Sequence, residues 1–226
     1  MPRLTFEQEL QHLLDEVLVL GSMVHTAIMA SVEGLKQRDL ETARRLILED
    51  RLINEKRFAI EAESLTLIAT QQPMAGDLRM IAAVLEIATE LERMGDYAKG
   101  ISKINLLIGH NTLLKPLVDI PKMADKAMDM LRRSLDAFVR RDVALARAIP
   151  LEDDEVDQLY NKTYHELLDM IMANPSTMDQ ASYLLWAAHN LERAADRVTN
   201  ICERVVFTVT GEMQEMDVDD EKALPQ

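Results

Sequence analysis

The stretch Leu91-Glu92-Arg93-Met94-Gly95-Asp96 recurs in nearly the same form one hundred residues later, as Leu191-Glu192-Arg193-Ala194-Ala195-Asp196. Both copies lie in sequence rich in Leu, Ala, Met and Glu, which favour the α-helix. In each copy a glutamate precedes an aspartate by four residues, so the two carboxylates project from one side of the helix. The two stretches therefore predict a duplicated helical unit in which each copy carries a carboxylate pair.

The composition of the whole chain agrees with a helical protein. Seven glycines, seven prolines and 4% aromatic residues in 226 residues are too few for a protein built from strands and many turns. The 48% of hydrophobic residues can supply a sizeable core without disulfides. We therefore predict an all-α fold.

Apolar residues recur with a period near 3.6 in long segments that end at Gly, Pro or Asp residues. An interior proline removes a backbone hydrogen bond, so Pro150 predicts a break in one of these helices. The segment 109–121, with one glycine and two prolines, reads as a linker. The predicted helices cover residues 5–37, 39–71, 77–108, 122–140, 142–173 and 177–209.

The duplication extends beyond the two opening stretches. Arg38-Asp39 and Glu49-Asp50 in the first half match Arg141-Asp142 and Glu152-Asp153 in the second. Three helices then fall in each half, which predicts two tandem homologous three-helix bundles, six long helices in all. The predicted boundaries are residues 1–112 for the first bundle, 113–210 for the second and 211–226 for an acidic, mobile tail.

Charge and targeting features narrow the class of protein. With 39 acidic and 25 basic residues the formal charge is −14, which disfavours nucleic acids and anionic membrane surfaces as partners. The N-terminus lacks the apolar core of a secretory signal, and apolar runs such as Met80 to Leu85 are too short to span a bilayer. The single cysteine, Cys202, fits a reducing compartment. We expect a cytoplasmic protein.

Each carboxylate pair has a predicted partner on the preceding helix. Asp50 and Asn54 lie as far before the turn at Pro73 as Glu92 and Asp96 lie after it. If the two helices are antiparallel neighbours, these four side chains face each other, ~30 Å along the bundle from the turn.

The second half gives the same result. Asp153 and Asp157 lie about as far before the turn at Pro175 as Glu192 and Asp196 lie after it. Two independent matches of this kind predict a four-residue cluster of oxygen ligands in each bundle.

Carboxylates that converge between helices lose solvation and repel each other unless a cation compensates them. Oxygen ligands suit hard cations such as Mg²⁺ or Mn²⁺, iron is compatible, and zinc is less favoured. The alternative is that the acids are solvated helix faces, neutralised by Arg93 and Arg193. His189 could add a nitrogen ligand, but its counterpart in the first half is Thr89.

The usual enzyme motifs are absent from the sequence. It contains no P-loop, no G-x-G-x-x-G, no H-E-x-x-H and no G-x-S-x-G. Glu9 and His12 form a single E-x-x-H, whereas di-iron oxidases of the ferritin type use two. We therefore expect no enzyme. Two alternatives stay open, a carboxylate-bridged metal enzyme of unknown substrate and a helical interaction protein without metal.

These motifs resemble those of a known family. D-x-x-x-N or D-x-x-x-D on the second helix of each unit, followed by L-E-R-x-x-D on the third, is similar to the PhoU family of bacterial phosphate-signalling regulators. The segments Gln72 to Arg79 and Asp196 to Ile201 also look like the family's. The resemblance covers roughly residues 5–209.

The resemblance implies two three-helix bundles packed side by side, each with a metal cluster. Family members are cytoplasmic, often dimeric, negative regulators of the phosphate-starvation response. They connect the high-affinity phosphate ABC transporter with a sensor histidine kinase, so contact with the membrane is indirect. Asn54 departs from an all-acid ligand set. The implied metal ligands are Asp50, Asn54, Glu92 and Asp96 in the first bundle, and Asp153, Asp157, Glu192 and Asp196 in the second.

Overall fold

The computed structural model describes residues 2–216, and the side chains of residues 5–216. Within this range the chain forms long helices and no strand. The first half consists of α1 (Pro2–Gln37), α2 (Leu40–Gln71) and α3 (Ala75–Ile108). The second consists of α4 (Asp119–Arg140), α5 (Val143–Ala148), α6 (Asp153–Ala173) and α7 (Met178–Thr210), with short 3₁₀ turns at Ile149–Glu152 and Pro175–Thr177. The predicted all-α class is confirmed.

The turn that starts the second helix of each half has the same design. Arg38 and Arg141 both adopt a left-handed backbone, with φ of 57° and 54°. The next residues, Asp39 and Asp142, cap the N-termini of α2 and α5 by accepting hydrogen bonds from backbone N–H groups of the first turn. The repeat seen in the sequence is therefore also present in the local structure.

The break predicted at Pro150 is confirmed, and a few other helix boundaries are shifted. The helix predicted over residues 142–173 is divided into α5 and α6, because the chain passes through a 3₁₀ turn at Pro150. The third helix begins at Ala75 and the fourth at Asp119, each before the predicted start. Pro121, which the sequence predicts at the end of a linker, lies in the first turn of α4, where a missing backbone N–H has no cost.

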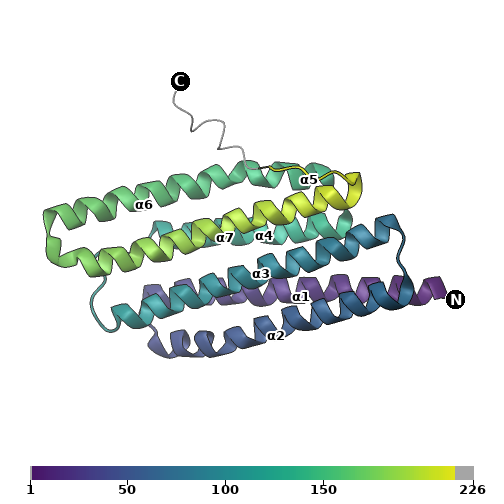
Figure 1. The fold of residues 1–226 in the computed structure, drawn as a ribbon. Coiled ribbons are helices and arrows are strands. Elements are labelled where there is room, and N and C mark those ends of the chain that lie inside the picture. The colour runs from purple at the N-terminus through teal and green to yellow at the C-terminus, as the bar shows by residue number, and fades with distance from the viewer. Residues whose placement is uncertain (1, 217–226) are drawn as a thin grey trace, which may run out of the picture.

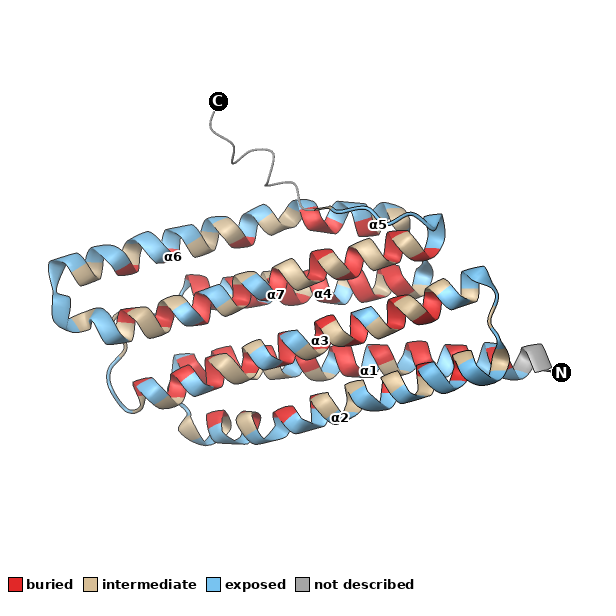
Figure 2. Ribbon diagram, viewed as in Figure 1, coloured by how far each residue is buried: buried red, intermediate tan, exposed pale blue. Residues whose placement is uncertain are grey.

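The two halves lie side by side and share one core. Figure 1 shows α3 and α7 running next to each other along the middle of the molecule, and α1 also packs against α4. The buried side chains of both halves belong to one apolar cluster, and Figure 2 shows them on the helix faces that point inward. A Cβ atom on Gly21 would lie only 2.3 Å from Leu135 Cδ1, so any larger residue there would force the Leu135 side chain on α4 to move.

The first helix combines two properties. By length and composition alone, Thr5–Gln37 could cross a membrane, although its continuous apolar runs are short. Its apolar residues Leu13, Val17 and Leu20 are fully buried in the core. One such helix is weak evidence for a membrane span, because the core helix of a soluble protein can pass the same test.

The described part of the predicted tail forms hydrogen bonds with helices of the second half. The backbone N–H of Met216 donates a 2.9 Å hydrogen bond to Glu203 on α7, and Arg147 on α5 donates to Gln214. Residues 217–226, which carry the rest of the predicted acidic tail, lie outside the described residues.

Candidate metal centres

The first carboxylate cluster lies beside a close contact between α2 and α3. Gly95 faces Ile53 there, and a Cβ on the glycine would be 3.0 Å from the isoleucine side chain. Asp50 is buried at this level, with 6% of its side chain exposed, and the Asn54 amide donates a 3.2 Å hydrogen bond to Asp50 Oδ2. The small residue in the repeated motif thus brings the two helices together beside the acids.

A lysine joins the first cluster. Lys99 Nζ lies 2.6 Å from Asp50 Oδ2 and 3.6 Å from Asp96 Oδ1, so its ammonium group bridges α2 and α3. The hydrogen bond to Asp50 is the main cause that raises the pKa of Lys99. This residue was missed in the sequence. Its position, three residues after Asp96 on the same helix face, could have indicated it.

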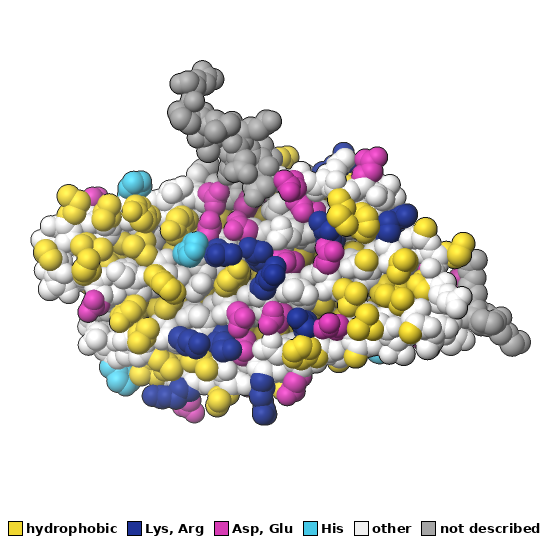
Figure 3. Space-filling view, viewed as in Figure 1, with side chains coloured by type: hydrophobic (Ala, Val, Ile, Leu, Met, Phe, Trp, Pro, Cys, Tyr) yellow, Lys and Arg dark blue, Asp and Glu magenta, His cyan; other side chains and the backbone are white. Residues whose placement is uncertain are grey.

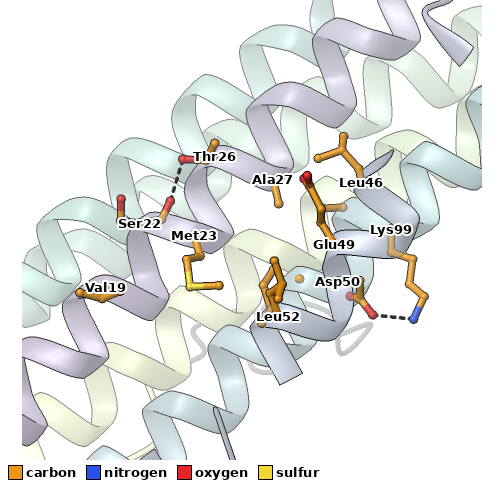
Figure 4. Close-up of a pocket in the computed structure, with 13 residues that line it drawn as sticks. Val19, Ser22, Met23, Thr26, Ala27, Leu46, Glu49, Asp50, Leu52 and Lys99 are labelled. Carbon is orange, nitrogen blue, oxygen red and sulfur yellow. Dashed lines mark hydrogen bonds and ion pairs between the residues drawn. The ribbon is translucent and has the colours of Figure 1, made fainter. Parts of the chain in front are cut away.

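Glu92 completes the predicted set on α3. Burial raises the pKa of its carboxyl group, and the charges of Asp96 and Asp50 raise it further, against the lowering effect of Arg57. A pocket of about 380 Å³ opens beside Asp50, between α1, α2 and α3. Figure 4 shows Asp50 and Lys99 on one wall of this pocket, with Met23 and Leu52 among its apolar lining.

The second cluster lies between α6 and α7. Burial raises the pKa of Glu192 to about 7, and the charges of Asp196 and Asp157 raise it further. Asp153 stands one turn before Asp157 on α6 and is half-buried. His189 Nδ1 lies 3.0 Å from Glu192 Oε2.

Glu192 Oε2 is a hydrogen-bond acceptor that receives no hydrogen bond. The atom is buried, and among the described residues no donor is aligned to give it a hydrogen bond, His189 included. An acceptor that is desolvated in this way is costly unless a donor or a cation compensates it. The residue that corresponds to Lys99 is Thr199, which is buried and carries no charge. The position that a lysine fills in the first cluster is therefore neutral in the second.

The two clusters differ in how well their side chains suit a metal ion. With the side chains as they stand, no group of three or more His, Cys, Asp or Glu residues in the described chain is placed to hold a metal ion. The donors are nevertheless the oxygens that hard cations prefer. Glu192 offers an orphaned buried oxygen, whereas Asp50 already contacts the ammonium of Lys99. The second cluster fits a cation better than the first.

The weaker candidates do not form a site. His12 is exposed and lies 3.7 Å from Glu63 on α2, and Glu9 accepts a long hydrogen bond from Gln71. Cys202 is buried among apolar residues, and burial raises the pKa of its thiol to about 12. The thiol is thus protonated and unreactive at neutral pH.

The comparison with known families matches this duplicated architecture. The family model described as "PhoU domain" matches the chain twice, over residues 17–104 and 120–205. The chain belongs to the PhoU family. Each PhoU-domain match contains one complete cluster, while the predicted boundary at residue 112 falls between the matches and stays a prediction.

Proteins similar to this chain are PhoU proteins over nearly their whole length. A homologue from Clostridium acetobutylicum, named as a phosphate-specific transport system accessory protein, is 37% identical over 96% of this chain and 100% of its own. One from Aquifex aeolicus is 33% identical, over 91% and 93%. The crystal structure of the Streptococcus pneumoniae phosphate transport system regulatory protein PhoU superposes with a TM-score of 0.86 at 32% identity, covering 92% of this chain and 99% of that one.

Proposed function

We propose that this PhoU-family chain is a metal-binding negative regulator of phosphate uptake and of the phosphate-starvation response. The relatives that carry the name of a phosphate-specific transport accessory protein match nearly the full chain, which supports the phosphate role. The observation that carries the metal-binding part is the cluster between α6 and α7, where Glu192 presents a buried oxygen without a hydrogen bond.

In this proposal the chain's own carboxylates do the binding. Asp153, Asp157, Glu192 and Asp196 would hold a hard cation, iron, Mn²⁺ or Mg²⁺, between α6 and α7, with Zn²⁺ less favoured. Bound metal supplies positive charge that offsets the repulsion within the cluster. Glu92, Asp96, Asp50 and Asn54 would form the corresponding site between α2 and α3. No redox or hydrolytic step is assigned to either cluster.

The regulator would act as a cytoplasmic adaptor between the phosphate ABC transporter and a sensor histidine kinase, and as a homodimer. Exposed apolar side chains at the end of the second half support a role in protein contacts. Met172 near the end of α6 is 74% exposed, and Trp186 on α7 is 70% exposed. Met178, the first residue of α7, is also exposed. Figure 3 shows hydrophobic side chains gathered at the end of the molecule where α6 turns into α7.

Deletion of the gene tests the regulatory part. In the deletion strain we expect a phosphate-responsive promoter to stay active at high phosphate, and a plasmid copy of the wild-type chain to restore repression. Normal repression in the deletion strain would contradict the proposal.

A second experiment separates the metal from the regulation. Elemental analysis of protein purified without chelator should find bound metal in the wild type and less in the double variant Glu192→Gln, Asp196→Asn. Repression restored equally by that variant would show that the second cluster is not needed for signalling. Turnover of a phosphate monoester by the purified, metal-loaded protein would contradict the non-enzymatic role.

A further inference from the structure

A small hollow lies on the seam between the two halves. It is lined by Arg93, Asp96 and Tyr97 from α3 and by Arg193 and Arg197 from α7, and it encloses about 370 Å³. Arg93 and Arg193 are the arginines of the two repeated motifs. The side-by-side packing of α3 and α7 brings them to one place. The hollow is thus formed only when both halves are present.

Two of the three arginines contact a buried acid outside the lining. Glu90 is 9% exposed, and its two oxygens contact Arg93 Nη1 at 2.5 Å and Arg197 Nη1 at 3.3 Å. Asn200 donates a further 3.0 Å hydrogen bond to Glu90. The guanidinium group of Arg193 lies 5.9 Å from the centre of the Tyr97 ring. This support orders the cationic groups before any ligand binds, which lowers the entropy cost of binding.

The lining has more donors than acceptors. Three guanidinium groups carry five N–H donors each, while Asp96 supplies the one carboxylate in the lining. The Nε atom of Arg197 is buried and has no hydrogen-bond partner among the described residues. On a chain of formal charge −14, this is a local concentration of positive charge. Figure 3 shows Lys and Arg side chains near the middle of the face where α3 and α7 lie, with Asp and Glu side chains between them.

We propose that this hollow is a binding site for a phosphoryl oxyanion. Planar guanidinium forks match pairs of phosphate oxygens. The acidic remainder of the surface repels anions, so an anion is favoured at the arginines. Tyr97 is the only large ring in the lining, so a hydrophilic ligand fits better than an apolar one. Free inorganic phosphate and the phosphoryl end of a nucleotide share this chemistry. The site goes beyond the proposed metal binding, with which it shares only Asp96.

The site has a structural consequence. Its arginines belong to different PhoU-domain matches, since Arg93 falls within residues 17–104 and Arg193 and Arg197 within 120–205. A bound oxyanion would accept hydrogen bonds from both halves and tie α3 to α7. Binding at the seam would therefore be communicated to both bundles.

Calorimetric titration of the full-length, chelator-treated protein with sodium phosphate at fixed ionic strength tests the proposal. Parallel titrations with ADP and with sodium sulfate distinguish free phosphate from a nucleotide and from any divalent oxyanion. We expect binding of phosphate or ADP, and about tenfold weaker binding for Arg193→Gln, because a charge-assisted hydrogen bond is lost. Arg132→Gln, which changes an exposed arginine on α4 that pairs with Asp129, is the matched control and should bind as the wild type does.

The variant Asp96→Asn gives a result of opposite sign. It removes the one carboxylate of the lining, so we expect oxyanion binding to strengthen several-fold. If the anion instead binds to metal held by the clusters, the same variant weakens binding and the proposal is wrong. Absence of phosphate and ADP binding at millimolar concentration, or equal affinity of the wild type and Arg193→Gln with an unchanged melting temperature, would also overturn it. Metal content, measured separately, tests the metal proposal independently.

Discussion

At the scale of single residues, the two clusters differ at one position, which carries a cation in the first and a neutral residue in the second. In the first, the ammonium of Lys99 contacts Asp50 and Asp96. In the second, Thr199 stands at the corresponding position and Glu192 has its pKa raised to about 7 by burial first and then by Asp196. A sequence repeat thus contains two electrostatic environments, and each can be tested by one substitution.

The variant Glu192→Gln should change how stability depends on pH in metal-free protein. The folded pKa of about 7 lies above the ordinary value of 4.5, so the wild type loses stability as pH rises between these values. At pH 8 the variant should be more stable by about 1–2 kcal/mol, since it carries no charge to bury. At pH 4 the two should be nearly equal. Urea unfolding at both pH values measures this, and equal stability at pH 8 would contradict it.

The variant Lys99→Thr should convert the first cluster to the type of the second. In metal-free protein, Asp50 would be left buried without its cation, so we expect a loss of about 1–3 kcal/mol. Added Mn²⁺ should recover stability in the variant and raise the bound metal per chain relative to the wild type. Thermal melts with and without Mn²⁺, together with elemental analysis, measure both effects. Lys103→Thr, one turn further along α3, is the matched control.

At the scale of elements, short polar residues decide where the long helices begin. The Asp39 side chain accepts hydrogen bonds from the backbone N–H groups of Glu41 and Thr42 and from the Thr42 hydroxyl. The hydroxyl is the main cause that lowers the pKa of Asp39, and the backbone of Thr42 acts in the same direction. The cap therefore stabilises the folded chain when Asp39 is ionised.

The variant Asp39→Ala should lower the melting temperature by a few degrees at pH 7, because α2 loses its N-terminal acceptor. The difference should shrink as pH falls below the ordinary pKa of 3.8, since protonation removes the same stabilisation from the wild type. Melting curves at pH 7 and pH 3 measure it. Glu55→Ala, on an exposed position of the same helix, should leave the melting temperature nearly unchanged. A fall that is independent of pH would contradict the capping role.

At the scale of the whole molecule, the two halves depend on each other. Their buried side chains form one cluster, and ion pairs such as Glu86 with Arg204 and Glu90 with Arg197 cross from α3 to α7. An isolated half would expose the apolar surface that now lies between the halves. Two similar units in the sequence therefore need not be two independent folding units.

We expect a single cooperative unfolding transition of the full chain, with the same midpoint by calorimetry and by circular dichroism. The variant Gly21→Leu should lower that midpoint, because even a Cβ atom there meets the Leu135 side chain at 2.3 Å. Gly76→Leu, at a position where a Cβ atom meets nothing within 4 Å, is the control for steric effects. Two separate transitions in the wild type would show that the halves unfold independently.

The sequence by itself determined the helices and the duplication, and it predicted that Asp50 and Asp96 lie at one level of their hairpin. Helix period, capping residues and proline breaks act within a few residues, and an antiparallel hairpin converts distance from its turn into position along the bundle. Only the tertiary structure decided that Lys99 bridges the first cluster, that Glu192 keeps a buried oxygen without a hydrogen bond, and that Arg93 and Arg193 line one hollow at the seam. These outcomes depend on which helix faces are buried against each other across the chain, and local pattern does not specify that.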